Sequence, residues 1–403
     1  MSSRPYPDSA LRRILIVVEN LPVPLDRRVW LEATSLTAAG YEVSVICPMG
    51  RGWNKTYELI DGVHIHRHPA PPEAHSGAIA YAREYAHAIR HWFRLARVIR
   101  QERGFDVIHG CNPPDLVFLL ALRYRLAGVR YLFDHHDVCP ELFEAKFGKR
   151  GLLYGVMRLW ERMTFACAHV SIATNESFAR IARDRGGMAP EDVFVVRSAP
   201  RIEKFLPGAG DPAYRKSGTV LGWIGIIGQQ EGLELLVEAV RHLRDMGKID
   251  VHVLIIGFGP HQPVIEAEVA RAGLTDHFTF TGALYGEAML GALNAIDIGV
   301  APDPKNAMND ISTMNKVMEY MTLEKPVVQF DLTEGRASAG DASLYARAND
   351  PRDLADRIAW LMDNPDDARV MGRRGRERVL DRLSWDHSVP QLLAAYERVF
   401  SKD

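Results

Sequence analysis

The segment STMNKVMEYM, residues 312–321, combines an apolar helical repeat with a lysine and a glutamate one turn apart. Its apolar side chains have the spacing of a buried helical stripe, and they are Met314, Val317, Met318 and Met321. Ser312 is a candidate N-cap, so Lys316 would lie near the positive helix end, where a cation favours a nearby anion such as phosphate. Glu319, beside Asn315, could accept hydrogen bonds from both hydroxyls of a ribose. A solvated lysine–glutamate pair is the alternative interpretation.

A second group of reactive residues lies in YLFDHHDVCPELF, residues 131–143, directly after an apolar run. Asp134, His135, His136 and Asp137 would stand at the carboxyl end of a strand, where a doubly wound sheet presents its site. Imidazoles there can donate to substrate hydroxyls or relay a proton. A structural histidine pair is one alternative and a metal site another. Since no matching third-ligand motif is visible in the sequence, we expect no metal.

Basic and amide side chains accompany the same edge of this first predicted sheet. Arg27 and Arg28 open the helix that follows the first strand, and Asn112, in GCNPPDL, follows another strand. These residues are candidates for binding a diphosphate or an anionic acceptor. Ordinary surface charges are the alternative for the two arginines.

Glycines follow two strands in the second half of the chain, in LGWIGIIGQQEG and IIGFGP. Glycine lets a backbone approach a ligand closely, and the helix N-terminus after such a turn offers free N–H groups. Gly225, Gly228, Gly257 and Gly259 together therefore favour a nucleotide, whereas turn chemistry alone is the alternative for each.

The order of elements predicts an α/β protein with two doubly wound domains in tandem. Strands alternate with helices, as in the strand from Ile14 to Val18, a helix capped by Asp26, and a strand ending at Pro48. Residues 200–217 lack periodicity and are rich in proline and glycine, which is typical of a linker. A cleft between two such sheets is where these folds bind ligands.

The composition excludes several other classes of protein. The chain has 403 residues and a formal net charge of -2, so bulk charge gives no indication of a nucleic-acid partner. The four cysteines form no CxxC pair and are expected to be buried thiols in a reducing compartment. We expect no signal peptide in residues 1–13 and no membrane span, hence a cytoplasmic protein. The absence of GxGxxG, a Walker lysine loop and GxSxG argues against dehydrogenases, P-loop enzymes and serine hydrolases.

Six segments together resemble the retaining family-4 glycosyltransferases of GT-B fold, over nearly the whole chain. They are NLPVPLDRRVWLEATSLTAAGYEVSVICP, NPPDLVFL, FDHHDVCPELF, SIATNESFARIA, NKVMEYMTLEKPVV and MGRRGRERVLDRLSWDHSVPQLLAAYERVF. The chain is most similar to bacterial members that build exopolysaccharide or O-antigen units on a lipid carrier. The resemblance implies two Rossmann-like domains facing each other across a cleft: an acceptor-side domain over residues 1–205 and a donor domain over 206–384. Residues 385–403 would form a helix that returns to the first domain.

The resemblance also assigns roles to particular residues. Glu319 matches the family's ribose-binding glutamate, and His136 in the D-x-H-D pattern matches the histidine that approaches the donor sugar, with Asp137 beside it as a catalytic residue. The family's first glutamate falls on Ile311, and IIGQQEG replaces its usual diphosphate-binding arginine and lysine. Backbone amides around Gly228, with Lys316 and Arg27, are the replacements that we expect.

The implied activity is transfer of a sugar from a UDP- or GDP-linked donor to a hydroxyl of a glycan, a lipid-linked sugar or a small molecule. Same-face attack would retain the anomeric configuration, and no cofactor or metal would be required. A sugar-nucleotide epimerase of the same fold and a non-catalytic nucleotide-sugar-binding protein are the alternatives.

Peripheral contact with an anionic membrane, on its inner face, is a further hypothesis. It rests on the helix expected over residues 80–102, whose basic face would carry Arg83, Arg90, Arg94, Arg97 and Arg100. The opposite face is apolar, with Tyr81, Tyr85, Ala88, Ile89, Trp92, Ala96 and Ile99. The basic segment 146–150 is a second candidate for lipid contact. The alternative is a helix packed on the core with a solvated basic face.

Overall fold

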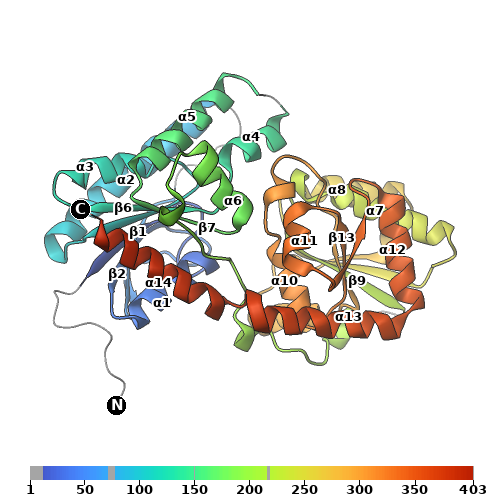
Figure 1. Ribbon diagram of the computed structural model, residues 1–403. Helices are drawn as coiled ribbons and strands as arrows, with labels where there is room; N and C mark the ends of the chain where they lie inside the picture. Colours follow the sequence, from blue (N-terminus) through green and yellow to red (C-terminus); the bar gives the residue numbers. More distant parts are fainter. Residues whose placement is uncertain (1–11, 71–77, 149, 216–217, 403) are drawn as a thin grey trace, which may run out of the picture. The chain divides into compact units, whose positions relative to one another are not determined.

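The structure is a computed structural model that describes residues 12–70, 78–148, 150–215 and 218–402 (Figure 1). The side chains of residues 78–82, 146 and 147 also fall outside the description. Three expectations therefore concern parts that are not described: the polar N-terminal segment through residue 11, the place of Tyr81 on its helix, and the basic side chains at positions 146 and 149.

The chain divides into two compact units, each built on its own sheet. The first comprises Met1–Glu144, Lys149–Val196 and Ser388–Asp403, and the second comprises Ala145–Gly148 and Arg197–His387. The chain therefore leaves the first unit after Val196 and re-enters it at Ser388, within the last helix.

The first unit contains an eight-stranded sheet in the order β3-β4-β2-β1-β5-β6-β7-β8. The strands are parallel except for the edge pair of β3 and β4. Branched apolar residues predominate in β1, and all of β5 is buried. The strands are β1 (Arg13–Val17), β2 (Glu42–Pro48), β3 (Tyr57–Ile60), β4 (Val63–His68), β5 (Val107–Cys111), β6 (Arg130–His135), β7 (Val170–Ala173) and β8 (Val193–Val195).

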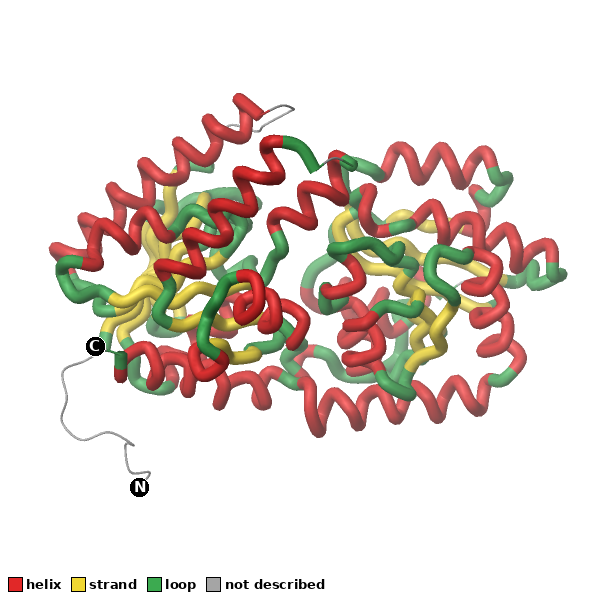
Figure 2. Tube along the Cα trace, turned by 45° about the horizontal axis from the view of Figure 1, so that its top comes forward, coloured by secondary structure: helices red, strands yellow, loops and turns green. Residues whose placement is uncertain are grey.

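Helices cover both faces of this sheet (Figure 1). On one side lie α1 and α14, and on the other lie α2, α3 and α5 (Figures 1 and 2). Tyr396 of α14 ties the end of the chain to β5, with its hydroxyl 2.8 Å from Nδ1 of His109. The helices are α1 (Arg27–Ala38), α2 (Ala78–Glu102), α3 (Phe118–Arg125), α4 (Cys139–Phe147), α5 (Leu152–Cys167), α6 (Glu176–Arg180) and α14 (Trp385–Ser401).

The second unit contains a six-stranded parallel sheet in the order β11-β10-β9-β12-β13-β14. The strands are β9 (Thr219–Ile226), β10 (Val251–Phe258), β11 (Phe278–Phe280), β12 (Ile298–Ala301), β13 (Val327–Phe330) and β14 (Ser343–Ala346). The helices are α7 (Leu233–Asp245), α8 (Gln262–Arg271), α9 (Gly286–Asn294), α10 (Asn315–Thr322), α11 (Thr333–Ala339), α12 (Pro351–Asp363) and α13 (Pro365–Arg378).

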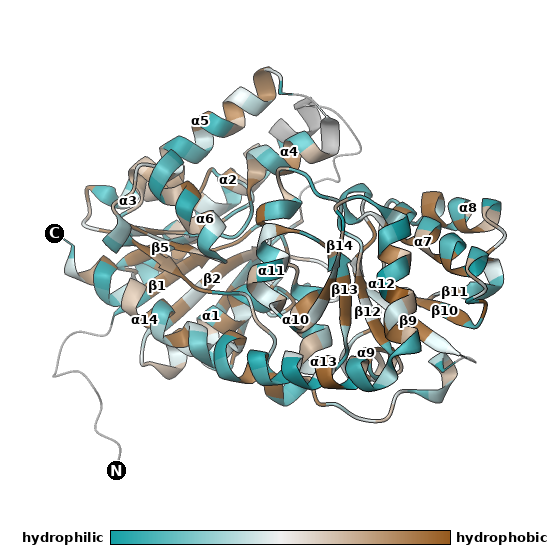
Figure 3. Cartoon of the chain, turned by 45° about the vertical axis from the view of Figure 1, so that its right-hand side comes forward, coloured by the Kyte–Doolittle hydropathy of each residue, from teal (hydrophilic) through white to brown (hydrophobic). Residues whose placement is uncertain are grey.

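Two apolar cores hold this second sheet between its helix layers. One core joins the sheet to α7, α8 and α12, and the other joins it to α9 and α10. Figure 3 shows the strands in brown between helices whose outer sides are largely teal. Amphipathic helices such as α7 and α12 therefore bury one face each against the sheet, as the sequence periodicity predicts.

The predicted α/β class, with two doubly wound units in tandem, is confirmed. The hairpin of β3 and β4 was not predicted. In β3, Tyr57 and Leu59 point into solvent, so its apolar residues do not mark a buried face. No described helix is long and apolar enough to cross a membrane.

Gly257 marks a very close approach between β9 and β10. Its φ is +138°, and a Cβ atom there would lie 1.9 Å from the carbonyl oxygen of Gly225. We expect Gly257→Ala to destabilise the second unit by about 2–4 kcal/mol, since the clash and the backbone strain add. Differential scanning calorimetry should show this as a lower unfolding midpoint.

Gly128→Ala is the matched control for this prediction. Gly128 also has a positive φ, of +75°, but nothing lies within 4 Å of its would-be Cβ atom. Strain alone should cost about 1 kcal/mol there. Equal shifts in both variants would contradict the close contact at Gly257.

Candidate functional site

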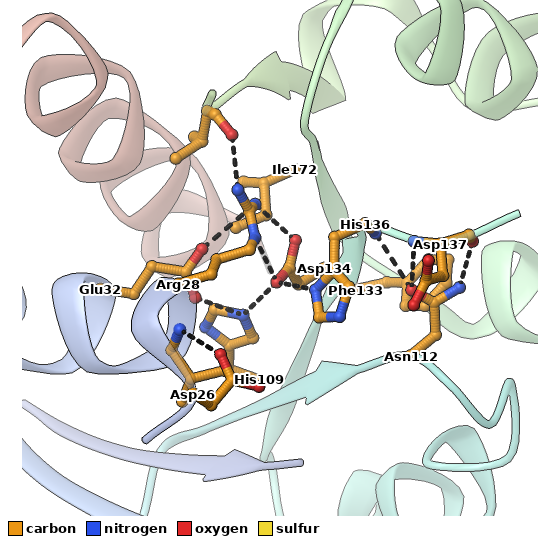
Figure 4. A network of polar contacts seen from close by, with 12 residues as sticks. Asp26, Arg28, Glu32, His109, Asn112, Phe133, Asp134, His136, Asp137 and Ile172 are labelled. Atoms are coloured by element: carbon orange, nitrogen blue, oxygen red, sulfur yellow. Dashed lines mark hydrogen bonds and ion pairs between the residues drawn. The ribbon is translucent and has the colours of Figure 1, made fainter. Parts of the chain in front are cut away.

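A buried network of charges lies at the carboxyl ends of β5 and β6 in the first unit (Figure 4). Asp134 is the last residue but one of β6 and is fully buried. Arg28, in the first turn of α1, donates from Nε to Asp134 Oδ2 at 2.9 Å and from Nη2 to Oδ1 at 2.6 Å. Asp26 caps this helix by accepting a hydrogen bond from the Val29 N–H group, which fixes the position of the Arg28 backbone in the first turn.

The Arg28–Asp134 pair is bidentate and sets the electrostatics of the network. Burial opposes ionisation of Asp134, but Arg28 and His136 outweigh it and hold the pKa of this carboxyl well below its usual range. Nη1 of Arg28 donates to the Val196 carbonyl oxygen at 2.8 Å. A planar guanidinium suits such a paired geometry better than an ammonium group would.

The prediction that Arg28 binds a diphosphate or an acceptor is therefore wrong. Its guanidinium is buried and is engaged by Asp134, Glu32 and the Val196 carbonyl. Arg27 lies beside it on α1 but is exposed. Its predicted role stays a prediction.

Asn112 is also used inside the protein and not on its surface. Its Oδ1 accepts bonds from the backbone N–H groups of His136 and Asp137, both at 3.0 Å. Its Nδ2 donates to Asp115 Oδ1 at 3.0 Å and to the Asp137 carbonyl at 2.6 Å. The predicted contact of Asn112 with diphosphate or acceptor is thus corrected: it shapes the turn that presents residues 136 and 137.

His136 is the member of this network that reaches the surface. Its Nδ1 lies 2.7 Å from Asp134 Oδ2, and its side chain is 11% exposed. Burial lowers the pKa of His136, but Asp134 outweighs it and raises the pKa to about 9. Nε2 has no hydrogen-bond partner among the described residues. At neutral pH His136 is thus a fixed imidazolium with one N–H group to offer, next to the half-buried Asp137.

His135 belongs to the core, as the structural alternative predicted. Its ring packs against Phe133, Phe165 and Phe178, with ring centroids 5.5, 5.2 and 5.1 Å away. Burial, with the nearby charge of Arg185, lowers the pKa of His135 to about 3, so the ring is neutral.

Four buried groups beside Asp134 have the composition of a metal site. The ligand atoms of Glu32, His109, Cys111 and Asp134 all lie within 4.8 Å of one another. Arg28 already lies among them, with Nη2 2.6 Å from Asp134 and 3.1 Å from Glu32. Burial and the charge of Asp134 raise the pKa of Glu32, which favours its neutral form. These residues therefore do not suit a divalent cation, which would be repelled by the guanidinium.

In the second unit, the helix with Lys316 and Glu319 begins later than predicted. The N-cap of α10 is Met314, and Ser312 instead donates from Oγ to the Met308 carbonyl at 2.7 Å. From Lys316 to Thr322 every residue is buried, so the helix is not divided into an apolar and a solvated face. Asn315 is exposed at its start. Glu319 is buried, so the alternative of a solvated pair on the surface is excluded.

Lys316 is held by two carboxylates of its own unit. Its Nζ lies 2.8 Å from Glu231 Oε2 and 2.8 Å from Asp303 Oδ1, and 5.0 Å from the centre of the Trp223 ring. Burial disfavours its charge, but the two carboxylates outweigh burial and raise the pKa of Lys316. The sequence correctly indicated an anion near this lysine, but the chain supplies it. The charge of Lys316 is thus paired within the chain, and its predicted contact with a donor phosphate stays a prediction.

The glycines at this edge are explained in part by contacts within the chain. A Cβ atom at Gly259 would lie 2.3 Å from the Ile227 carbonyl oxygen, and one at Gly257 would meet Gly225. At Gly228 the nearest atoms belong to the Gln230 side chain, and at Gly225 to the Trp223 ring. The turn interpretation therefore accounts for Gly257 and Gly259, whereas Gly225 and Gly228 lie beside side chains.

The helix N-terminus expected near Gly228 lies further along the chain. A short 3₁₀ turn, Gln229–Glu231, follows Gly228, and α7 begins at Leu233 after Gly232 in a left-handed conformation. A Cβ atom at Gly232 would lie 2.2 Å from the Pro302 carbonyl oxygen, so this cap has to be glycine.

Several residues of the site were not predicted from the sequence. Asp303 and Glu231 hold Lys316, and Glu32 completes the charge network of the first unit. Asp303 lies two residues after the strand in DIGVAPDP, so its position near a strand end was a visible signal. Exposed apolar side chains were also missed. Ile226 is the last residue of β9, Phe258 is the last residue of β10, and Tyr285 immediately precedes α9.

The chain folds into two Rossmann-like units in tandem, which is the architecture of the GT-B class. Residues 25–199 match the family described as "Glycosyl transferase 4-like domain", and residues 218–364 match "Glycosyl transferases group 1". The chain is 31% identical to the 2-deoxystreptamine glucosyltransferase of Streptomyces kanamyceticus, over 69% of this chain and 73% of that protein. The chain therefore belongs to the group 1, family-4 glycosyltransferases.

Other known proteins agree with this assignment. The 2-deoxystreptamine N-acetyl-D-glucosaminyltransferase of Streptomyces fradiae is 27% identical over 72% of this chain and 68% of that protein. The fold is similar to sucrose-phosphate synthase from Thermosynechococcus elongatus, with a TM-score of 0.77 and 18% identity, covering 97% and 99% of the two chains. It is also similar to Anabaena HepE, whose structure holds UDP and glucose, with a TM-score of 0.73 and 14% identity, covering 96% and 99%.

The His136–Asp134 pair should make stability depend on pH. His136 stays protonated to about pH 9 in the folded protein but only to about pH 6.5 in the unfolded chain. Its contribution, roughly 3 kcal/mol, is therefore fully present below about pH 6.5 and is lost as pH rises through about 9. Urea denaturation of the wild type and His136→Gln at intervals across this range should show a steeper loss in the wild type.

The exposed His387, which lies outside this network, provides the control. His387→Gln should keep the pH profile of the wild type. If His136→Gln also follows that profile, the assigned charge of His136 is wrong.

Proposed function

We propose that this glycosyltransferase moves a sugar from a UDP- or GDP-linked donor to a hydroxyl, with retention of the anomeric configuration. The observation that carries the proposal is Glu319, a buried carboxylate on α10. That helix packs under β9 through Tyr320, whose hydroxyl donates to the Gly222 carbonyl at 3.2 Å. A carboxylate so held is suited to both hydroxyls of a ribose, which a nucleotide donor provides.

The same edge of the second unit offers features that match the rest of a nucleotide. Ile226 and Phe258 lie opposite each other at the ends of β9 and β10, and both are exposed. With the exposed Tyr285 they provide apolar surface for a base. The turn after Gly228 and the start of α7 offer backbone N–H groups to a diphosphate. Because Lys316 is neutralised by carboxylates, we assign the diphosphate to these amides, with Arg27 as a further candidate.

On the side of the first unit, we propose that His136 acts on the donor sugar. Asp134 fixes its ring and keeps it charged, so Nε2–H can donate to a sugar hydroxyl or to the developing charge on the leaving group. Asp137 would bind a second polar group of the sugar or acceptor. The acceptor hydroxyl would attack on the face from which the diphosphate departs, with that phosphate as base and no metal required.

The acceptor is a hydroxyl of a glycan, a lipid-linked sugar or a small molecule. The names of two relatives point to 2-deoxystreptamine, a small polyhydroxy acceptor, for those proteins. We propose a cytoplasmic place of action. A lipid-linked acceptor would bring the protein to the inner face of the membrane.

A panel of UDP- and GDP-sugars, each with and without sugar and aminocyclitol acceptors, tests this function. We expect nucleoside diphosphate release that one donor and one acceptor together increase, and NMR of the product should show the donor's anomeric configuration. A new sugar nucleotide formed from donor alone would instead indicate an epimerase. Tight donor binding without release under any combination would indicate a non-catalytic protein.

Glu319→Gln should weaken nucleotide binding. Glutamine keeps one acceptor oxygen, so the substitution removes about one hydroxyl–carboxylate bond, which contributes about 1.5–3 kcal/mol, and we expect a loss of roughly ten- to a hundredfold in affinity. Isothermal titration calorimetry with UDP and GDP measures it. The control is Glu324→Gln, at an exposed glutamate just after the same helix. If Glu319→Gln binds nucleotide with the affinity of the wild type, the ribose does not bind to Glu319.

A further inference from the structure

The outer side of α5 carries an apolar stripe that is open to solvent. Leu152, Leu159 and Met163 are 87%, 55% and 38% exposed. Together with Leu153 and the half-buried Val156 they form the α5 stripe. Val156, Leu159 and Met163 follow Leu152 by four, seven and eleven positions, so these four side chains share one helical face, and Leu153 adjoins them. The stripe is about 17 Å long, at 1.5 Å per residue. The other side of α5 is packed, for example through Phe165 against Phe133.

The neighbouring helices extend this apolar surface within one layer. α3 contacts both α2 and α5, and Tyr85 of α2 packs edge-on against Trp160 of α5, with centroids 6.2 Å apart. Figure 1 shows the three helices over the same face of the sheet, and Figure 3 shows brown segments on α5. Apart from Tyr57 and Leu59, every exposed large apolar side chain described in the first unit lies on this layer or at its ends: Val98, Leu122, Leu126, Leu152, Leu153, Leu159 and Met163. Such a concentration is typical of an interaction surface.

The exposed charge of the same layer is almost entirely positive. The exposed basic residues on the three helices are Arg83, Arg90, Arg94, Arg97, Arg123, Arg125 and Arg162, and Arg150 precedes α5. Among the described side chains of these helices, Glu102 is the only exposed acidic residue. The whole chain has a net charge of -2, so this surface differs in sign from the protein as a whole.

We propose that the layer of α2, α3 and α5 docks on an anionic lipid surface, with the α5 stripe entering the boundary between headgroups and acyl chains. Leucine and methionine side chains suit that boundary, and arginines around them suit lipid phosphates. A second copy of the chain is a poorer occupant, because a two-fold interface would place one set of arginines against the other. The docking proposal does not depend on the proposed function. Only the further step, that docking brings the protein to a lipid-linked acceptor, rests on that function.

Flotation of the full chain with vesicles tests the proposal. We expect binding to phosphatidylcholine vesicles that contain phosphatidylglycerol, little binding to phosphatidylcholine alone, and weaker binding as salt rises. The triple variant Leu152→Ser, Leu159→Ser, Met163→Ser should lose at least about tenfold in partition coefficient, since each buried side chain contributes. Replacing Arg94, Arg97 and Arg125 by glutamine should cost roughly fivefold per residue.

Matched controls come from exposed residues of the second unit. The apolar control replaces Leu206, Ile249 and Val264 by serine, and the charge control replaces Arg241, Arg271 and Arg369 by glutamine. Both should bind vesicles like the wild type. Equal loss in a control and its test variant, or no binding of the wild type at low salt, would overturn the proposal.

Two further readings complete the test. Light scattering after size-exclusion chromatography would overturn lipid docking if the wild type is a dimer that the triple serine variant dissociates. Transfer to a water-soluble acceptor should be unchanged in the stripe variant, since none of its residues belongs to the proposed site. Failure of vesicle binding with transfer intact rejects the docking surface alone, whereas vesicle binding without transfer rejects the proposed function alone.

Discussion

The buried pair of Arg28 and Asp134 is the constraint around which the first unit is arranged. One guanidinium joins three segments: the start of α1, the end of β6 and the backbone after β8 at Val196. Transferring two charges from water into the protein interior is unfavourable. Replacing one partner of such a buried pair leaves the other charge uncompensated and typically lowers the free energy of unfolding by about 3–5 kcal/mol. The pair in turn makes Asp134 a permanent anion, and that anion both orients and charges His136. His136, the imidazole of this network that reaches the surface, thus depends on a buried ion pair.

The second unit uses the same arrangement with a lysine. Lys316 on α10 is neutralised by Asp303 at the end of β12 and by Glu231 ahead of α7. In both units a basic side chain on a helix pairs with carboxylates from strand ends or turns. These ion pairs stabilise the packing of the helix against the end of the sheet. The buried cations Arg28 and Lys316 are thus both paired with carboxylates of the chain itself.

The sequence predicted the two doubly wound units, though not the β3–β4 hairpin, and it predicted the site only in part. Alternation of strand and helix patterns predicted both doubly wound units, because burial of branched apolar runs between amphipathic helices leaves a strong periodic signal. The position of His136 directly after a strand, and of Glu319 on a helix that feeds a core strand, followed from the same pattern. Partners could not be predicted: Arg28 and Asp134 are more than a hundred residues apart in the chain, and nothing local shows that they meet. The roles of Arg28, Asn112 and Lys316 were assigned to a ligand because each lay at the correct edge, whereas buried partners decide how each is used.

The return of the last helix to the first unit sets an order on folding during synthesis. The Tyr396 hydroxyl lies within hydrogen-bond distance of His109 on β5, and Phe400 stacks on Tyr41, so α14 forms part of the cover of that sheet. These residues leave the ribosome only after the whole second unit has been made. The first unit, although translated first, therefore completes its packing last, and until then its β5 face is exposed to chaperones and to other chains. The protein that emerges from the ribosome has to keep its first-made half open while the second half folds.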